Sequence, residues 1–198
     1  MSRRRQAAGF SLIEILLVIS IMAIVAGLVL PASDPSIHDQ LQSAARIVVA
    51  DLAYARSLAV THNSSYRIDF ELAENRYVLR HSGAEAALDV LPQSPWRNPE
   101  DRPDEHVVDL DELPHVGIAA RIAAVAEAGS LLRPVNNVEF GPLGEVTRPA
   151  YTVIWLGGGK GHSQRYVAVY VNPVSGLATI GSYTAEPPPG AVAVAHSD

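Results

Sequence analysis

The sequence predicts an α+β protein in which a long N-terminal helix packs on an antiparallel β-sheet. Three patterns support this fold class. Residues 10–30 are almost entirely apolar, residues 34–61 repeat apolar side chains at helical spacing, and residues 65–182 alternate short apolar stretches with Gly- and Pro-containing turns. Helical segments followed by such strands are typical of an α+β domain, with the amphipathic part of the helix covering the sheet.

The apolar run at the N-terminus is long enough to span a membrane. Three arginines precede Gly9, and the 21 residues of 10–30 contain one ionisable side chain, Glu14. A helix of this length is about 31 Å long, which matches the hydrocarbon core of a bilayer. Arginines before such a helix stay in the cytoplasm, so the C-terminal part is expected on the other side. An acid at the centre of a spanning helix costs about 2.5–3.5 kcal/mol, so Glu14 requires a partner or a function.

The residues GFSLIE at 9–14, followed by an apolar helix, resemble the leader of type IV pilins and type II secretion pseudopilins. In that family a prepilin peptidase cuts after the glycine and the new N-terminus is methylated. The resemblance implies that residues 1–9 are a cleaved basic leader, that cleavage falls between Gly9 and Phe10, and that Phe10 becomes N-methylated. It also implies that residues 10–30 form the transmembrane and assembly helix.

Glu14 is the residue expected to act in assembly. It lies about 6 Å, one helical turn, from Phe10, and cleavage would give Phe10 a cationic amino group. A carboxylate attracts such a group strongly in a low-dielectric setting, so Glu14 of one subunit could pair with the terminal amine of a neighbour and set the axial register of a fibre. In the family the same glutamate is also linked to methylation. The alternative is a carboxylate near the membrane interface with no partner.

An ordinary secretory signal does not account for this N-terminus. Such a signal has an apolar part of about 7–15 residues and small residues before its cleavage site, and neither feature is present. A plain signal anchor stays open as an alternative, although it leaves Glu14 without a role.

Composition argues against several classes of function. The formal net charge is −6, and loss of three leader arginines makes it −9 before the new amine is counted, which disfavours a general nucleic-acid binder. The chain has no cysteine, and its seven histidines show no His-x-x-x-His spacing, so we expect no metal and no cofactor. The acidic residues of 100–112 lack EF-hand spacing and are expected to form a solvated loop. We expect no catalytic residues and no enzymatic activity.

The amphipathic helix is expected to start with Asp34 as its cap and Pro35 in its first turn, and to end near residue 61. Its apolar stripe consists of Leu41, Ala45, Val48, Leu52, Ala55 and Ala59. Alternating side chains predict a β-hairpin over residues 65–81, with its turn at 73–75.

The rest of the chain is predicted to be mainly strands and turns. Residues 82–114 are an acidic, proline-rich excursion with a short strand at 106–110, and residues 116–132 fit either a strand or a helix. Further strands are expected at 135–140, 152–156, 164–171 and 178–182, with Trp155 in the core. Trp96 is expected to pack locally, and GGGKGH at 157–162 to form a hairpin tip because it lacks P-loop spacing. The head is assigned to residues 31–185, and residues 186–198 are expected to be a loose tail.

The C-terminal half carries a second resemblance. NVEFGPLG at 137–144 and NPVSGL at 172–177 resemble the turns of the H-type minor pseudopilin and FimT-like group. The resemblance implies a structural minor pseudopilin of a type II secretion system that supports protein export. It would sit in the bacterial inner membrane with a cytoplasmic N-terminus and a periplasmic head. Its partners would be the prepilin peptidase/methyltransferase, other pseudopilins or pilins, and the inner membrane, with no nucleic acid.

Two alternatives to this function remain. A minor pilin of a type IV pilus, acting in adhesion or DNA uptake, would need a basic stripe, for which Arg67, Arg76 and Arg80 are the candidates. A signal-anchored envelope enzyme is the more distant alternative.

Overall fold

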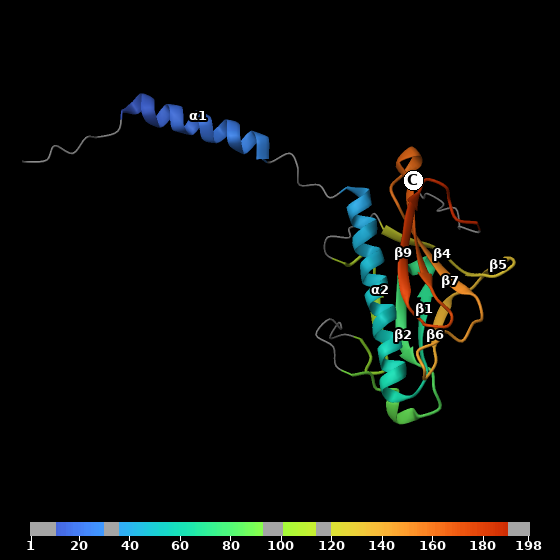
Figure 1. The fold of residues 1–198 in the computed structure, drawn as a ribbon. Helices are drawn as coiled ribbons and strands as arrows, with labels where there is room; N and C mark the ends of the chain where they lie inside the picture. Colours follow the sequence, from blue (N-terminus) through green and yellow to red (C-terminus); the bar gives the residue numbers. More distant parts are fainter. Residues whose placement is uncertain (1–10, 30–35, 93–100, 114–119, 190–198) are drawn as a thin grey trace, which may run out of the picture. The chain divides into compact units, whose positions relative to one another are not determined.

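The computed structural model describes residues 11–29, 36–92, 101–113 and 120–189 (Figure 1). The chain divides into two compact units, Met1–Pro35 and Ser36–Asp198. The described part of the first unit is helix α1, Leu12–Val29. Among the described residues, no helix is both long and apolar enough to cross a membrane. The predicted span also included Phe10 and Leu30, which lie outside the described residues.

The second unit begins with helix α2, Ile37–His62. Its N-cap is Ser36, whose hydroxyl accepts the Asp39 N–H at 3.2 Å and donates to the Asp39 carboxylate at 2.7 Å. The expectation that Asp34 caps the helix is wrong, because the helix begins two residues later than that cap requires and Ser36 satisfies its first turn. Asn63 ends the helix in the left-handed conformation, with φ 49°, and its N–H bonds back to the last turn.

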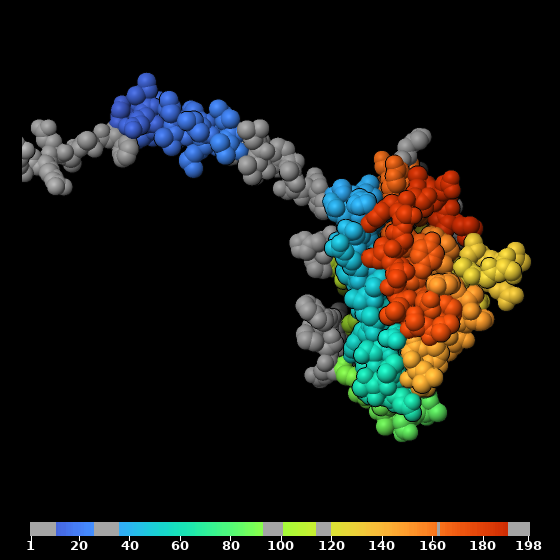
Figure 2. Space-filling view, in the orientation of Figure 1, coloured from blue at the N-terminus to red at the C-terminus, as the bar shows by residue number. Residues whose placement is uncertain are grey.

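The apolar face of α2 is the predicted one. All six residues of the expected stripe are buried, and Ala44 and Leu58 join them. Small alanines at this face let the helix approach the strands closely. The helix contacts strands of both sheets, and Figure 2 shows it alongside the orange and red C-terminal strands.

The strands divide between two antiparallel sheets, where the sequence indicates one. The four-stranded sheet has the order β3-β2-β1-β6, formed by His106–Asp109, Arg76–His81, Tyr66–Glu71 and Asn137–Phe140. The five-stranded sheet has the order β5-β4-β7-β8-β9, formed by Leu132–Pro134, Ala120–Ala128, Tyr151–Gly158, Arg165–Val171 and Ala178–Thr184. Short 3₁₀ turns occur at Leu72–Glu74, Ala86–Leu88 and Gly161–Ser163. The α+β class is confirmed.

The predicted hairpin is confirmed, and its turn joins the two sheets. Strands β1 and β2 pair from Tyr66↔His81 to Glu71↔Arg76. In the turn, the side chain of Asn75 is buried, donates to the Asp111 carboxylate at 2.7 Å and the Ala120 carbonyl at 3.0 Å, and accepts the Ile122 N–H at 2.9 Å. One amide therefore links the hairpin to the first residues of β4.

The segment 116–132, whose sequence fits either a strand or a helix, forms a strand over residues 120–128. Its alanines favour a helix locally, but β4 pairs along its whole length with β7 and carries a bulge between Ile122 and Ala124. Tertiary pairing therefore outweighs intrinsic propensity here. The short strand expected near residue 106 is also confirmed, because β3 pairs with β2.

The acidic excursion is less solvated than predicted. The Glu105 side chain is only 9% exposed and lies 2.6 Å from Arg80 and 3.0 Å from Arg102. Asp101 accepts the Val107 N–H at 3.1 Å, and Asp109 accepts the Asp111 N–H at 2.8 Å. Glu105 ties the segment to β2 through Arg80, because a buried carboxylate requires a partner, whereas Asp101 and Asp109 form hydrogen bonds within the segment.

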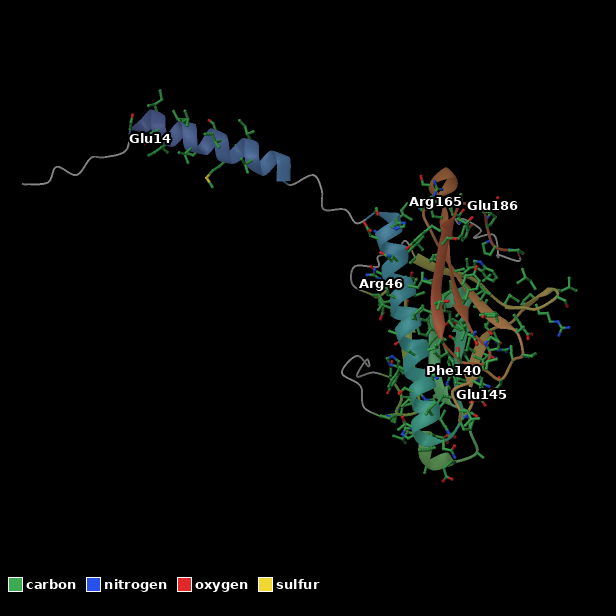
Figure 3. All side chains as sticks on the ribbon, in the orientation of Figure 1. Glu14, Arg46, Phe140, Glu145, Arg165 and Glu186 are labelled. Atoms are coloured by element: carbon green, nitrogen blue, oxygen red, sulfur yellow. The ribbon has the colours of Figure 1, made fainter. Side chains whose placement is uncertain are left out.

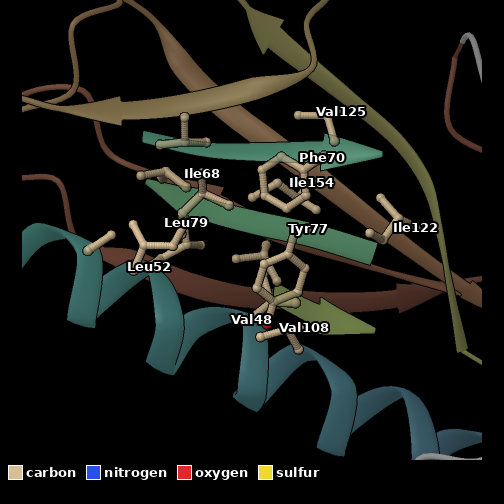
Figure 4. Packing of buried hydrophobic residues seen from close by; sticks show 14 of the residues in the cluster. Val48, Leu52, Ile68, Phe70, Tyr77, Leu79, Val108, Ile122, Val125 and Ile154 are labelled. Carbon is tan, nitrogen blue, oxygen red and sulfur yellow. The ribbon is translucent and has the colours of Figure 1, made fainter. Parts of the chain in front are cut away.

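The core lies between α2 and the facing sides of the two sheets (Figure 4). Ile154 and Leu156 of β7 belong to it and are fully buried. Trp155 lies between them, is half-buried and is not part of the core cluster, so its predicted core position is wrong. Alternate side chains of a strand point to opposite faces, and the Trp155 side chain is on the face away from Ile154 and Leu156. Trp96 lies outside the described residues.

Candidate processing and assembly site

Helix α1 carries the described part of the predicted site. Gly9 and Phe10, the cleavage and methylation residues, lie outside the described residues. Glu14 is in the first turn of α1, and Figure 3 labels it at the N-terminal end of that helix. Free backbone N–H groups and the positive end of the helix dipole at this terminus favour an acidic side chain.

Between residues 12 and 25, exposed apolar side chains dominate the surface of α1. Eleven large apolar side chains between residues 12 and 25 are exposed by 49–77%. The hydroxyl of Ser20 donates to the Leu16 carbonyl at 2.8 Å, so this polar group is satisfied within the helix. Apolar side chains exposed in this number favour cover by lipid or by other helices. Glu14 is the only ionisable side chain of α1, so it is the residue that can direct how a covering partner aligns.

Residues 4–30 match the family model described as the prokaryotic N-terminal methylation motif. The chain carries a prepilin-type N-terminus. The match includes the three residues predicted to form the site, Gly9, Phe10 and Glu14, and it confirms the resemblance of the N-terminus. Proteins with this motif are processed by prepilin peptidase and assemble with other pilins.

Two solved proteins resemble the chain in structure. The type IV minor pilin FimU of Pseudomonas aeruginosa is 17% identical, with a TM-score of 0.44, covering 78% of this chain and 96% of FimU. The minor pseudopilin EpsH of Vibrio cholerae is 12% identical, with a TM-score of 0.49, covering 73% of this chain and 95% of EpsH. No curated protein sequence matches the chain significantly. Because both TM-scores are below 0.5, neither likeness supports a function for this chain.

The proposed basic stripe on the hairpin is neutralised by carboxylates. Arg67 lies 3.0 Å from Asp69, and Arg76 lies 2.6 Å from Glu71. Arg80 contacts the buried Glu105 at 2.6 Å. A phosphate that bound these arginines would have to compete with the carboxylates.

Arg56 is a positioning residue that no sequence pattern reveals. Its Nε donates to the Gly144 carbonyl at 3.2 Å and to the Ser175 carbonyl at 2.7 Å, so it links the two turns that carry the C-terminal resemblance. Gly144 and Gly176 have φ of 81° and 64°, and a Cβ at Gly176 would clash with the Gly144 carbonyl. The two turns are thereby held as one rigid unit.

The other sequence features considered for chemistry are the glycine-rich run at 157–162 and the possible metal ligands. The glycine-rich run at 157–162 ends β7 and forms the connection to β8, as a hairpin tip. Among the described residues, no three His, Asp or Glu side chains are grouped closely enough to hold a metal ion.

Proposed function

We propose that this chain is a structural minor pseudopilin subunit of a bacterial type II secretion system. A prepilin peptidase removes residues 1–9, Phe10 is N-methylated, and the subunit joins a helical fibre through its N-terminal helix. Before assembly it is held in the inner membrane, with the N-terminus in the cytoplasm and the head in the periplasm. The observation that supports this most is the methylation motif over residues 4–30.

The chemistry of α1 supports assembly through this helix. Its exposed apolar side chains need lipid in the membrane or neighbouring helices in a fibre, and the same surface serves both environments. The transfer of such apolar side chains from lipid to a helix bundle costs little free energy. The alignment of the subunits then depends on polar groups.

Glu14 supplies that alignment. A carboxylate and an ammonium 4 Å apart attract by about 4 kcal/mol at an effective dielectric of 20. Because Glu14 is one turn from the processed terminus, its partner is the Phe10 amine of a neighbouring subunit, and the stagger that joins them sets the axial register. An unpaired Glu14 in an apolar bundle would be costly, so misaligned subunits are disfavoured.

A minor pilin of a type IV pilus is the second candidate, because it uses the same N-terminal motif. The DNA-uptake form of this function has less support, since Arg67, Arg76 and Arg80 are paired with carboxylates. Co-purification of the tagged chain with secretion pseudopilins or with pilins would distinguish the two machineries.

Glu14→Gln tests the assembly role, because it removes the charge and keeps the shape. We expect normal loss of the leader but at least about a 10-fold smaller share of the chain in sheared fibres. Ser20→Ala is the matched control, because the Ser20 hydroxyl is satisfied inside α1. A Glu14→Gln chain that is processed and enters fibres as well as the Ser20→Ala chain would refute the pairing.

A further inference from the structure

The five-stranded sheet is apolar on both of its faces. On β7, Ile154 and Leu156 belong to the core, so Val153 and Trp155 point to the opposite, outer face. The cross-strand register places four residues of the neighbouring strands on this outer face: Ala124 and Ala126 of β4, and Ala168 and Tyr170 of β8. An antiparallel sheet with one face in water alternates apolar and polar side chains. These strands do not alternate in this way, so we expect the outer face to be covered.

One part of the outer face is buried and another part is open. The buried part consists of five residues that are at most 6% exposed and lie outside the core cluster: Ala124, Ala126, Val153, Tyr166 and Ala168. The open strip consists of Tyr170, Tyr151 and Leu132 of β5, which are exposed by 40%, 44% and 40%. Tyr151 and Leu132 both lie opposite Ala128 of β4, so they share one face. Apolar side chains gathered in this way favour contact with a further apolar segment.

The chain that follows β9 leaves from one end of this face. Thr184, the last residue of β9, lies opposite Tyr166 of the buried part. Four residues later Pro188 is buried, whereas the residues on either side of it are exposed. Figure 3 labels Glu186 at the same end of the head as Arg165, the first residue of β8. The chain beyond β9 is therefore still packed on the head at this point.

The residues that come next fit the open strip in composition and in length. Residues 190–195 read GAVAVA, with Val192 and Val194 at alternate positions and no charged side chain. In an extended chain both valines point to the same side. Tyr166 and Tyr170 are four residues apart on β8, which is about 13 Å, and five extended residues span about 17 Å. The segment is therefore long enough to cover the open strip.

We propose that residues 191–195 lie extended across the outer face of the five-stranded sheet, with Val192 and Val194 packed on the open strip. The outer face is thus a docking surface whose occupant is a segment of the same chain. Tethering favours this occupant, because a segment joined a few residues from its site is present at an effective concentration in the millimolar range. The backbone groups of the docked segment stay at the surface, where water can hydrogen-bond them. This inference concerns the head alone and does not depend on the proposed function.

Trp155 lies on the outer face and can report whether the face is covered. The chain has two tryptophans, so Trp96→Phe leaves Trp155 as the single one. In this background, with the full chain held in lipid nanodiscs, we expect Val192→Asp combined with Val194→Asp to raise the acrylamide quenching constant of Trp155 at least about 2-fold, because a carboxylate does not pack on an apolar face without a partner. Val90→Asp is the matched control, because Val90 is 65% exposed and lies in the excursion, and it should leave the quenching unchanged.

A cross-link identifies the occupant, because the chain has no cysteine of its own. Val194→Cys combined with Tyr170→Cys should be joined within one chain by a short bismaleimide, and Val90→Cys combined with Tyr170→Cys should not. The proposal is overturned if the two tail aspartates change the quenching of Trp155 no more than Val90→Asp does. It is equally overturned if the cross-links join two chains, because a second copy would then be the occupant. Where the tail aspartates also lower the midpoint of thermal unfolding, the cross-link decides alone.

Discussion

Removal of the Tyr77 hydroxyl should measurably destabilise the head. Tyr77 is 1% exposed, and its hydroxyl donates a hydrogen bond to Asp51 of α2, across the helix–sheet interface. Hydrogen bonds to charged groups contribute about 1.5–3 kcal/mol. Asp51 is only partly buried, so water replaces some of the lost bond, and we expect the lower value, about 1.5 kcal/mol, for Tyr77→Phe.

Urea unfolding of the unit Ser36–Asp198, which contains the whole core, measures this change. With an m value of about 2 kcal/mol per M, the midpoint should fall by about 0.75 M. Tyr170→Phe is the matched control: this tyrosine is 40% exposed and its variant should stay within about 0.5 kcal/mol of wild type. A Tyr77→Phe change no larger than that of the control would refute the reasoning.

The same pair predicts a pH dependence. Burial raises the pKa of Asp51, while the Tyr77 hydrogen bond and the nearby His106 lower it to a smaller extent. A raised pKa means that the folded state holds the proton more tightly than the unfolded state. The contribution of Asp51 is therefore complete below the unfolded pKa of about 4 and is lost as the pH rises through the folded value. Asp51→Asn keeps a hydrogen-bond acceptor for Tyr77 and removes the loss of stability that follows ionisation of Asp51. Its stability relative to wild type should increase from pH 4 to pH 7, measured by urea midpoints.

Three further predictions concern the rest of the head. Asn75→Ala should lower the free energy of unfolding by about 3 kcal/mol, because it removes two buried hydrogen bonds and one partly buried one at a residue with positive φ. Asn75→Gly should cost about 1 kcal/mol less in the same titration, and equal losses would contradict the backbone part of the argument. Arg56→Lys should lower the midpoint of thermal unfolding by about 2–6 °C, because a lysine cannot place one donor against both the Gly144 and the Ser175 carbonyls. An unchanged midpoint would mean that the turns containing Gly144 and Ser175 hold each other without the arginine. The head should not retain duplex DNA in a gel-shift assay at about 150 mM salt, and neutralising Arg67, Arg76 and Arg80 together should change nothing.

Local patterns in the sequence are enough to predict the helices and strands whose side chains repeat at a regular spacing. The stripe of α2 and the alternation of β1 and β2 each follow from a repeat that matches one regular structure. The GFSLIE run likewise identifies the N-terminal motif, because its residues are contiguous.

The features that local patterns do not predict depend on contacts between distant residues. Segment 120–128 is a strand because β7 pairs with it, and the division into two sheets follows from pairings that no local pattern contains. The acidic segment around Glu105 predicts a solvated loop, but Arg80, 25 residues away, draws Glu105 to the sheet. The contact of Arg56 with Ser175 spans 119 residues. His81 forms hydrogen bonds with both Ser64 and Asp89, which share no motif spacing with it, so only the fold brings the three side chains together.

Analysis of the mature N-terminus most directly tests the central claim, which is that the leader is removed and Phe10 becomes the methylated first residue. The chain should be isolated from cells of its own source and its first peptide analysed by mass spectrometry. The account predicts a chain that begins at Phe10 and carries one methyl group on its α-nitrogen. A chain that still begins at Met1, or one that starts downstream of the apolar helix, would contradict it.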